Sequence, residues 1–261
     1  FLNVQNSWLN LTMTVSGLTG TNVAGNGVDV HLSHIGAYSC ISQVNVISNS
    51  TGYVQEIRNF QQIMSLLINS NTDRATNLPG SIVSGTSEII SGFAVLGQTQ
   101  NIAGSAIPIQ NFSLPLIGLF GGRHLPLGFI NDNLMLEIIF TSDIRDILYA
   151  SVGSATTQIT GGQVSFTAEY DADVIIATDS TITKIRQASD ISNGIMSWSD
   201  TQIHAVNNSV SISELNSAGR AVKQTLVGGV KPKQLLQVFH TGFGGARGCG
   251  DQWQSLVYWS T

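Results

Sequence analysis

The side chains that could do chemistry in this chain are few, and none completes a catalytic motif. A hydrolase nucleophile elbow requires Gly-x-Ser-x-Gly, and both Gly80-Ser81 and Gly153-Ser154 lack the second glycine. No Gly-x-x-x-x-Gly-Lys-Ser/Thr phosphate loop occurs, and the glycine-rich segment 242–250 (GFGGARGCG) follows an expected strand without opening a helix. The sequence therefore predicts a protein that is not an enzyme.

Histidine and cysteine are also sparse. His31 and His34 are three residues apart, a spacing that would present two imidazoles to a metal ion from a helix, but their neighbours predict strand and loop. Cys249 and His240 would make a thiol nucleophile and its base only if the fold brought them together. We interpret the histidines as ordinary surface or core residues, and Cys40 and Cys249 as two free thiols.

Two pairs of aspartates are the best candidates for oxygen ligands of Ca²⁺. Asp171 and Asp173 follow a strongly alternating segment, and Asp143 and Asp146 lie close together in an expected loop. Carboxylate oxygens are the ligands that Ca²⁺ prefers. Solvated loop carboxylates are the simpler interpretation. The functional alternative is a Ca²⁺ ion held at a contact between subunits, with Asp171 and Asp173 as ligands; no other cofactor is expected.

The elements that must position these residues are mostly strands. In residues 134–140 the apolar side chains of Leu134, Leu136, Ile138 and Phe140 fall on one face and Glu137 on the other. Comparable patterns predict further strands at residues 8–15, 28–32, 41–47, 53–57, 163–170, 194–198, 202–206 and 235–240. The Gly- and Asn-rich residues 17–27 are expected to form a loop. Roughly eight to ten short strands are typical of a two-sheet sandwich, so we predict an all-β fold.

One segment has the period of a helix instead. Phe60, Ile63, Met64 and Leu67 recur at i, i+3, i+4 and i+7, which predicts one short amphipathic helix over residues 58–68. Residues 211–227 fit either a helix that begins with a capping box or a loop followed by a strand, and we favour the second.

Composition limits the remaining possibilities. The 261 residues suffice for one large domain covering 1–261, with a small projecting or extended part from about residue 230. Only 10% of residues are charged, which suggests a surface largely covered by neighbouring subunits. The net charge of −5 and scattered basic residues argue against nucleic acid being bound by these residues, and no run of 18 apolar residues predicts a membrane span.

Two longer segments carry a more specific pattern. Residues 110–142 read QNFSLPLIGLFGGRHLPLGFINDNLMLEIIFTS, and residues 41–67 read ISQVNVISNSTGYVQEIRNFQQIMSLL. The first resembles the "LPL-x-GLF/L-G" turn, the "LPLG" segment and the following strand of single-jelly-roll capsid proteins of small eukaryotic viruses. The second is similar to a strand, return strand and short helix of the same coat proteins. The two segments cover about a quarter of the chain, in the order that the family requires.

The resemblance implies a single eight-stranded jelly roll whose copies pack into a closed icosahedral shell, the virion, around a genome. Under this interpretation the functional residues lie at contacts between subunits, and Arg58, Arg123 and Asp143 are the charged residues nearest the expected interface loops. Each of them fits equally well a role in bracing its own loop. Because the chain begins at Phe1 without Met, we expect processed ends or further residues there, among them a basic arm that contacts the genome.

A secreted carbohydrate-binding β-sandwich, such as a lectin or adhesin module, is the alternative. Trp253, Tyr258 and Trp259 would then stack on sugars. The chain shows no secretory signal at its start, and its cysteines are expected to be unpaired. These features, together with the two matched segments, favour the shell subunit.

Overall fold

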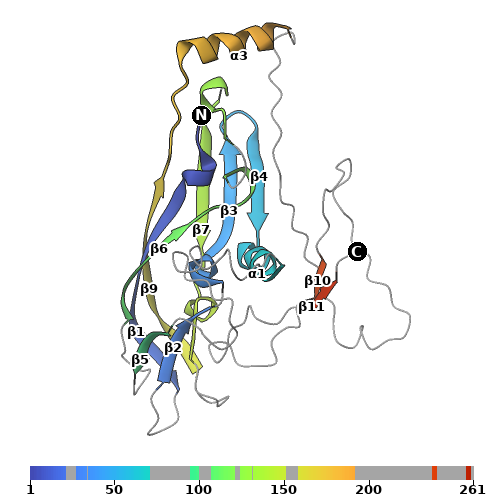
Figure 1. The fold of residues 1–261 in the computed structure, drawn as a ribbon. Coiled ribbons are helices and arrows are strands. Elements are labelled where there is room, and N and C mark those ends of the chain that lie inside the picture. Colours follow the sequence, from blue (N-terminus) through green and yellow to red (C-terminus); the bar gives the residue numbers. More distant parts are fainter. Residues whose placement is uncertain are drawn as a thin grey trace, which may run out of the picture.

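The computed structural model describes residues 1–21, 28–33, 35–70, 95–99, 107–120, 124–130, 132–150, 158–191, 237–239 and 257–259, which are mostly β-strands (Figure 1). The strands are β1 (Trp8–Thr21), β2 (Val28–Leu32), β3 (Ile41–Ser48), β4 (Gly52–Arg58), β5 (Val95–Thr99), β6 (Ile107–Leu114), β7 (Leu134–Phe140), β8 (Leu148–Ala150), β9 (Gln158–Asp171), β10 (Gln237–Phe239) and β11 (Val257–Trp259). The helices are α1 (Phe60–Ser70) and α3 (Asp179–Ile191), with short 3-10 turns η1 (Val4–Asn6), η2 (Gly36–Cys40), η3 (Gly118–Phe120), η4 (Leu127–Phe129) and η5 (Ile144–Asp146).

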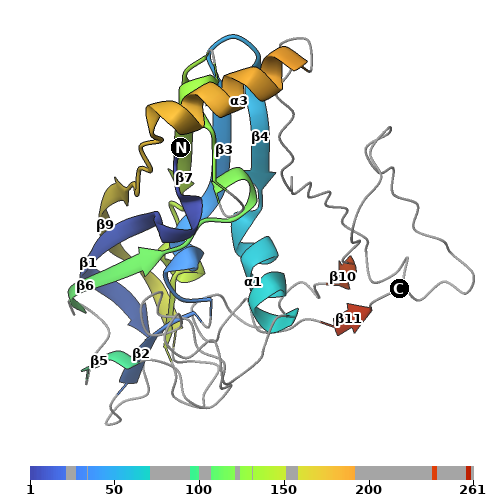
Figure 2. The same ribbon diagram turned by 45° about the horizontal axis from the view of Figure 1, so that its top comes forward.

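The strands form antiparallel sheets in two layers. One layer contains the sheet β6-β1-β9, with β5-β2-β8 continuing at its lower end, and the other contains β4-β3-β7 with α1 below it (Figures 1 and 2). A separate two-stranded sheet, β10-β11, comes from the last part of the sequence. Only β3-β4 and β10-β11 join strands that follow each other in the described chain; the other pairings link distant segments. This pattern confirms an all-β fold.

The core lies between the two layers. The predicted inward face of β1 is fully buried, and the Phe140 ring of β7 stacks on the Phe166 ring of β9 with centroids 5.0 Å apart. Leu134, Leu136 and Ile138 also pack against this core, as the alternation in β7 predicts. Burial of these side chains supplies the main stabilisation of such a sandwich, on the order of 25 cal/mol per Å² of apolar surface.

Strand β1 is longer than predicted, because residues 17–21 continue it instead of forming a loop. Gly17 has a φ of +59°, and the pairing of β1 with β9 shifts between Ser16 and Thr19. A β-bulge at a glycine in the left-handed region lets a strand continue past a residue that would otherwise signal a turn. The loop expected at residues 17–27 is therefore wrong for its first five positions, and residues 22–27 lie outside the described part.

The predicted helix is confirmed as α1. Asn59 has a φ of +53°, which asparagine tolerates better than most residues, and its carbonyl accepts the amides of Gln62 and Ile63 at 3.0 and 3.3 Å. Strand β4 thus turns directly into the helix. Phe60 and Met64 are buried, so the apolar stripe faces the core as its spacing predicts.

The expectation of a single helix is wrong, because α3 is a second one. Thr178 precedes it and its hydroxyl accepts the amide of Thr181 at 3.4 Å, in the position of an N-cap. Asp179 in the first turn suits the positive end of the helix dipole. The strands predicted at 194–198 and 202–206, and the ambiguous residues 211–227, lie outside the described residues.

Candidate functional site

The side of the β4-β3-β7 sheet that faces away from the core carries a connected row of polar side chains. Arg58 Nε lies 2.8 Å from Glu56 Oε1, and Gln43 Nε2 donates to the same oxygen at 3.1 Å. Gln43 Nε2 also donates to Asn45 Oδ1 at 2.8 Å, and Asn45 Nδ2 donates to Glu137 Oε2 at 2.6 Å. These five residues, here called the polar ladder, connect all three strands.

Strand register creates the polar ladder. Asn45 in the central strand pairs with Glu56 on one side and with Glu137 on the other, so the three side chains stand in one row across the sheet. Asn45 is only 1% exposed although it lies on the outward side, and it is hydrogen-bonded to Gln43 and Glu137. Two carboxylates against one guanidinium leave the row net negative. The arrangement fixes the side chains of the outer surface in one geometry.

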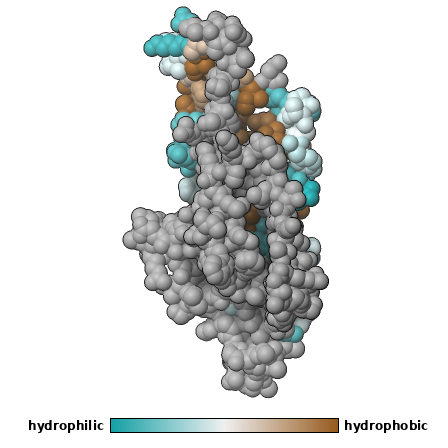
Figure 3. Space-filling model, turned by 90° about the vertical axis from the view of Figure 1, so that its right-hand side faces the viewer, coloured by the Kyte–Doolittle hydropathy of each residue, from teal (hydrophilic) through white to brown (hydrophobic). Residues whose placement is uncertain are grey.

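Exposed apolar side chains border the polar ladder. Tyr53 of β4 and Met135 of β7 both pair with Ile47 of β3, and they are 62% and 57% exposed. Ile139, which pairs with Gln43 at the other end of the ladder, is 40% exposed. The polar ladder together with Tyr53, Met135 and Ile139 is called the outer sheet face below. Apolar side chains gathered beside polar ones are visible at the upper end of the molecule in Figure 3.

A second exposed apolar group lies on the segment between β9 and α3. Val174, Ile175 and Ile176 are 61%, 39% and 90% exposed, and Leu127 of η4 is exposed as well. The segment is held in place through its backbone, because Leu2 forms antiparallel bridges to both Leu125 and Val174. Val174, Ile175, Ile176 and Leu127 are called the arm patch. Among the described residues, every large exposed apolar side chain belongs either to the arm patch or to the outer sheet face.

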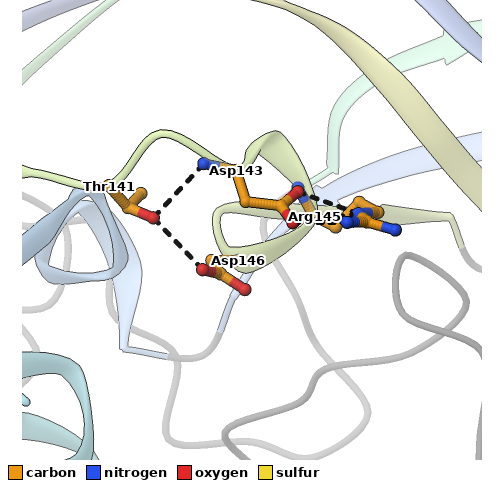
Figure 4. A network of polar contacts seen from close by, with 4 residues as sticks. All are labelled: Thr141, Asp143, Arg145 and Asp146. Atoms are coloured by element: carbon orange, nitrogen blue, oxygen red, sulfur yellow. Dashed lines mark hydrogen bonds and ion pairs between the residues drawn. The ribbon is translucent and has the colours of Figure 1, made fainter.

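Two of the three predicted interface residues can be located, and both bind within their own chain. Arg58 belongs to the polar ladder. The Asp143 carboxylate pairs with Arg145 Nη2 at 2.6 Å and accepts the Arg145 amide at 3.0 Å, which caps η5 (Figure 4). This ion pair raises the pKa of Arg145. Arg123 lies outside the described residues. The predicted role of these residues between subunits is therefore untested; Asp143 caps its own turn, and Arg58 pairs with Glu56 of its own strand.

The aspartates proposed as Ca²⁺ ligands occupy ordinary structural positions. Asp171 ends β9 opposite Trp8, and Asp173 Oδ2 accepts hydrogen bonds from Asn3 Nδ2 at 2.7 Å and Asn6 Nδ2 at 3.3 Å. Asp146 Oδ2 accepts the Thr141 hydroxyl at 3.1 Å (Figure 4). Within the described ranges, no three or more His, Cys, Asp or Glu side chains form a group that could hold a metal ion. Calcium binding stays a prediction.

The Asp132 carboxylate organises the β3-β4 turn. Its Oδ2 accepts the hydroxyls of Ser48 and Ser50 and the Ser50 amide at 3.1 Å, while its Oδ1 accepts the Asn133 amide at 2.7 Å. These donors, with the Ser48 and Ser50 hydroxyls first, hold the pKa of the Asp132 carboxyl well below its usual range. The turn that ends the outer sheet face is therefore tied to the residues that lead into β7.

The other chemical candidates do not form a site in the described residues. Cys40 is a buried free cysteine, and burial raises the pKa of its thiol to about 12. His31 lies in β2 opposite Tyr149, whereas His34, His240 and Cys249 are outside the described part. Within the described chain, the helices are too short or too polar for any of them to span a bilayer.

Residues 41–67 and residues 110–142 contribute neighbouring strands in the structure. Strands β3 and β4 come from residues 41–67, and β7, which pairs with β3, comes from residues 110–142. A further link joins them where Gln55 Oε1 accepts the Leu119 amide at 2.8 Å. The segments together build the sheet that carries the outer sheet face.

Sequence reasoning missed most of the outer sheet face. It placed Glu137 on the outward side of its strand but did not connect it with Gln43, Asn45 and Glu56. The alternation of these polar residues with Val44 and Val46 was a usable signal for their common face. Their contacts with β7 depend on a pairing across 92 residues, which alternation does not specify.

Comparison with known proteins adds no family assignment. No protein-family model matches the chain, and no curated protein has a significantly similar sequence.

Proposed function

We propose that this chain is a structural subunit that assembles with copies of itself into a closed viral shell, and that its two layers belong to an eight-stranded jelly roll. The observation that carries the proposal is that, in the described residues, the exposed large apolar side chains come from two places, the outer sheet face and the arm patch. Exposed apolar groups that are contiguous and bordered by polar residues mark surfaces of protein contact.

The rigidity of the outer sheet face supports the same proposal. Its charged and amide side chains are already hydrogen-bonded to one another in the free chain. A surface with fixed side chains loses little conformational entropy when a partner binds. Closed symmetry then repeats each contact around the shell, so that contacts which are weak singly stabilise the assembly together.

The resemblance described above gives further support, because β3 and β4 of one matching segment pair in a single sheet with β7 of the other, whose first residues belong to β6 of the second layer. In the proposed shell, contact with the genome falls to a basic arm beyond the described residues, and any Ca²⁺ would lie between subunits at Asp171 and Asp173. The outer sheet face and the arm patch could join subunits without the basic arm and without Ca²⁺.

The test is the size of the purified chain, measured by sedimentation velocity and negative-stain electron microscopy. We expect closed particles or ring-shaped clusters. Met135→Asp puts a charge on an exposed apolar position and should weaken assembly roughly tenfold or more, equivalent to about 1.4 kcal/mol per contact. Thr167→Asp, at an exposed position of β9 outside both surfaces, is the matched control and should assemble normally.

Two results would count against this proposal, the first against the shell subunit itself and the second against the outer sheet face as its contact surface. One is a wild-type chain that stays a small oligomer at every concentration and is retained on a glycan column, which is the behaviour of the lectin alternative. The other is normal particle formation by Met135→Asp, which would remove the outer sheet face from the assembly contacts.

A further inference from the structure

Helix α3 makes no extensive packing contact with another described element of its own chain. Residues 179–188 are exposed except Ile182 and Ile185, which are partly buried. In Figures 1 and 2 the helix lies beyond the end of the sheet where β3 turns into β4. A 13-residue helix is marginally stable in water by itself. Such a helix needs a surface to pack on.

The chemistry of α3 defines that surface. Ile182 and Ile185 are three residues apart and share one side of the helix, and Arg186 lies one turn beyond Ile182 beside them. Lys184 adds a second exposed cation. The segment leading into the helix contributes Ile176, which is 90% exposed. The partner surface should therefore combine apolar side chains with carboxylates.

We propose that α3 and the arm patch of one copy dock on the outer sheet face of a second copy. This inference rests on the proposed shell function and names the contact through which the subunits join. Ile182 and Ile185 would pack on Tyr53, Met135 and Ile139.

Charge complementarity selects a second copy as the occupant. The outer sheet face carries Glu56 and Glu137 against one guanidinium, and Arg58 is already paired with Glu56 at 2.8 Å. Glu137 takes its hydrogen bond from the neutral amide of Asn45, so its charge is not balanced within the polar ladder. Arg186 beside the isoleucine pair supplies the missing positive charge, and opposite charges across an interface fix its register.

The dimensions of the two surfaces also agree. A helix of 13 residues is about 20 Å long and about 10–12 Å across. Strands β4 and β7 have seven residues each, which gives a face about 23 Å long, and three adjacent strands span about 10 Å between the outer two. One helix can therefore cover the whole outer sheet face.

The contact joins two different surfaces of the same subunit, so it is heterologous. Every copy offers one α3 and one outer sheet face, and contacts of this kind produce rings when the rotation between copies closes. Such rings are compatible with the rotational symmetry of a closed shell.

Charge exchange tests the contact. Arg186→Glu and Glu137→Arg should each weaken assembly at least roughly tenfold, because each places like charges together. The double variant should recover assembly. Gln187→Glu, which adds negative charge on α3 away from the isoleucine pair, is the control and should assemble as the wild type does. Thermal melting of each variant checks that it is folded. Glu137→Gln removes the charge of Glu137 but keeps a side-chain oxygen that can accept the hydrogen bond from Asn45.

Mixing the two single variants identifies the occupant. In the proposed contact, the new carboxylate on α3 of the Arg186→Glu chain meets the new guanidinium on the outer sheet face of the Glu137→Arg chain. The unchanged Arg186 of the Glu137→Arg chain likewise meets the unchanged Glu137 of the Arg186→Glu chain. A mixture of the two should therefore assemble with the two chains alternating, whereas neither chain assembles by itself. Recovery in the double variant without recovery in the mixture would mean that α3 folds back on its own sheet, which overturns the proposal.

Two further outcomes separate the contact from the shell function. A wild type that forms particles while every folded variant does the same overturns the contact alone. A wild type that never assembles overturns the shell function and the contact together.

Discussion

The Gln55 carboxamide fills the space that a side chain on Gly118 would need. A Cβ atom at Gly118 would lie 2.6 Å from Gln55 Oε1 and 2.8 Å from Gln55 Cδ, and Gly118 has a φ of +72°. The same oxygen accepts the Leu119 amide at 2.8 Å. The Gly-Leu-Phe turn is thus closed over β4 by a glycine that no other residue replaces without strain.

Gly118→Ala should destabilise the chain by about 2–4 kcal/mol, because it combines a left-handed backbone with a steric conflict at a buried amide. Urea unfolding measures the effect. Gly128→Ala is the control, since a Cβ atom there would meet nothing within 4 Å and the φ of Gly128 is not positive. Equal stability of the two variants would show that the turn is not closed in this way.

Asn45→Ala should cost about 1–3 kcal/mol of unfolding free energy, because it removes the amide that joins Gln43 to Glu137 and leaves polar groups without a partner. Arg58→Ala, at the exposed end of the polar ladder, should leave stability unchanged, since exposed ion pairs contribute little. Chemical denaturation of both variants separates the two positions. A larger loss of unfolding free energy for Arg58→Ala than for Asn45→Ala would contradict the prediction that Asn45 contributes more to stability than Arg58 does.

Periodicity predicts the parts of this fold in which one face of an element is buried. Leu134 to Phe140 and the stripe of α1 follow this rule, because the core selects side chains at a fixed spacing. Periodicity fails at Gly17, where a bulge lets β1 continue. It also fails at α3, where only Ile182 and Ile185 form an apolar stripe, because the described core of the sandwich does not extend to this helix. An element that packs on little of the described chain leaves a weak pattern.

The candidate site was harder to predict from the sequence than the fold was. Charged residues near expected loops were reasonable candidates, yet Asp143 is used to cap its own turn, and Arg123 is outside the described residues. The residues that make up the outer sheet face become neighbours only through the register of β3 with β4 and β7. That register is set by packing between layers, and a single sequence contains no direct record of it.

The Cys40 thiol should be inert in the folded chain. Burial raises its pKa to about 12, so the thiolate fraction at pH 8 is roughly one in ten thousand even before access is considered. In a Cys249→Ser background, where Cys40 is the single cysteine, Ellman's reagent should label it only at the rate of unfolding. Labelling in seconds under native conditions, with the far-UV circular dichroism unchanged, would contradict its burial.

The Asp132 carboxyl should make stability depend on pH in the acidic range. Its pKa is lowered in the folded chain by the Ser48 and Ser50 hydroxyls, so the unfolded chain binds the proton first as the pH falls below about 4. The stabilisation is therefore complete at neutral pH, declines as the pH drops from about 4, and is lost below the folded-state pKa. Asp132→Asn should unfold at a lower temperature than the wild type at pH 7, and the difference should narrow between about pH 4 and pH 2. A difference that stays constant over this range would show that the serine hydroxyls do not hold the ionised carboxylate.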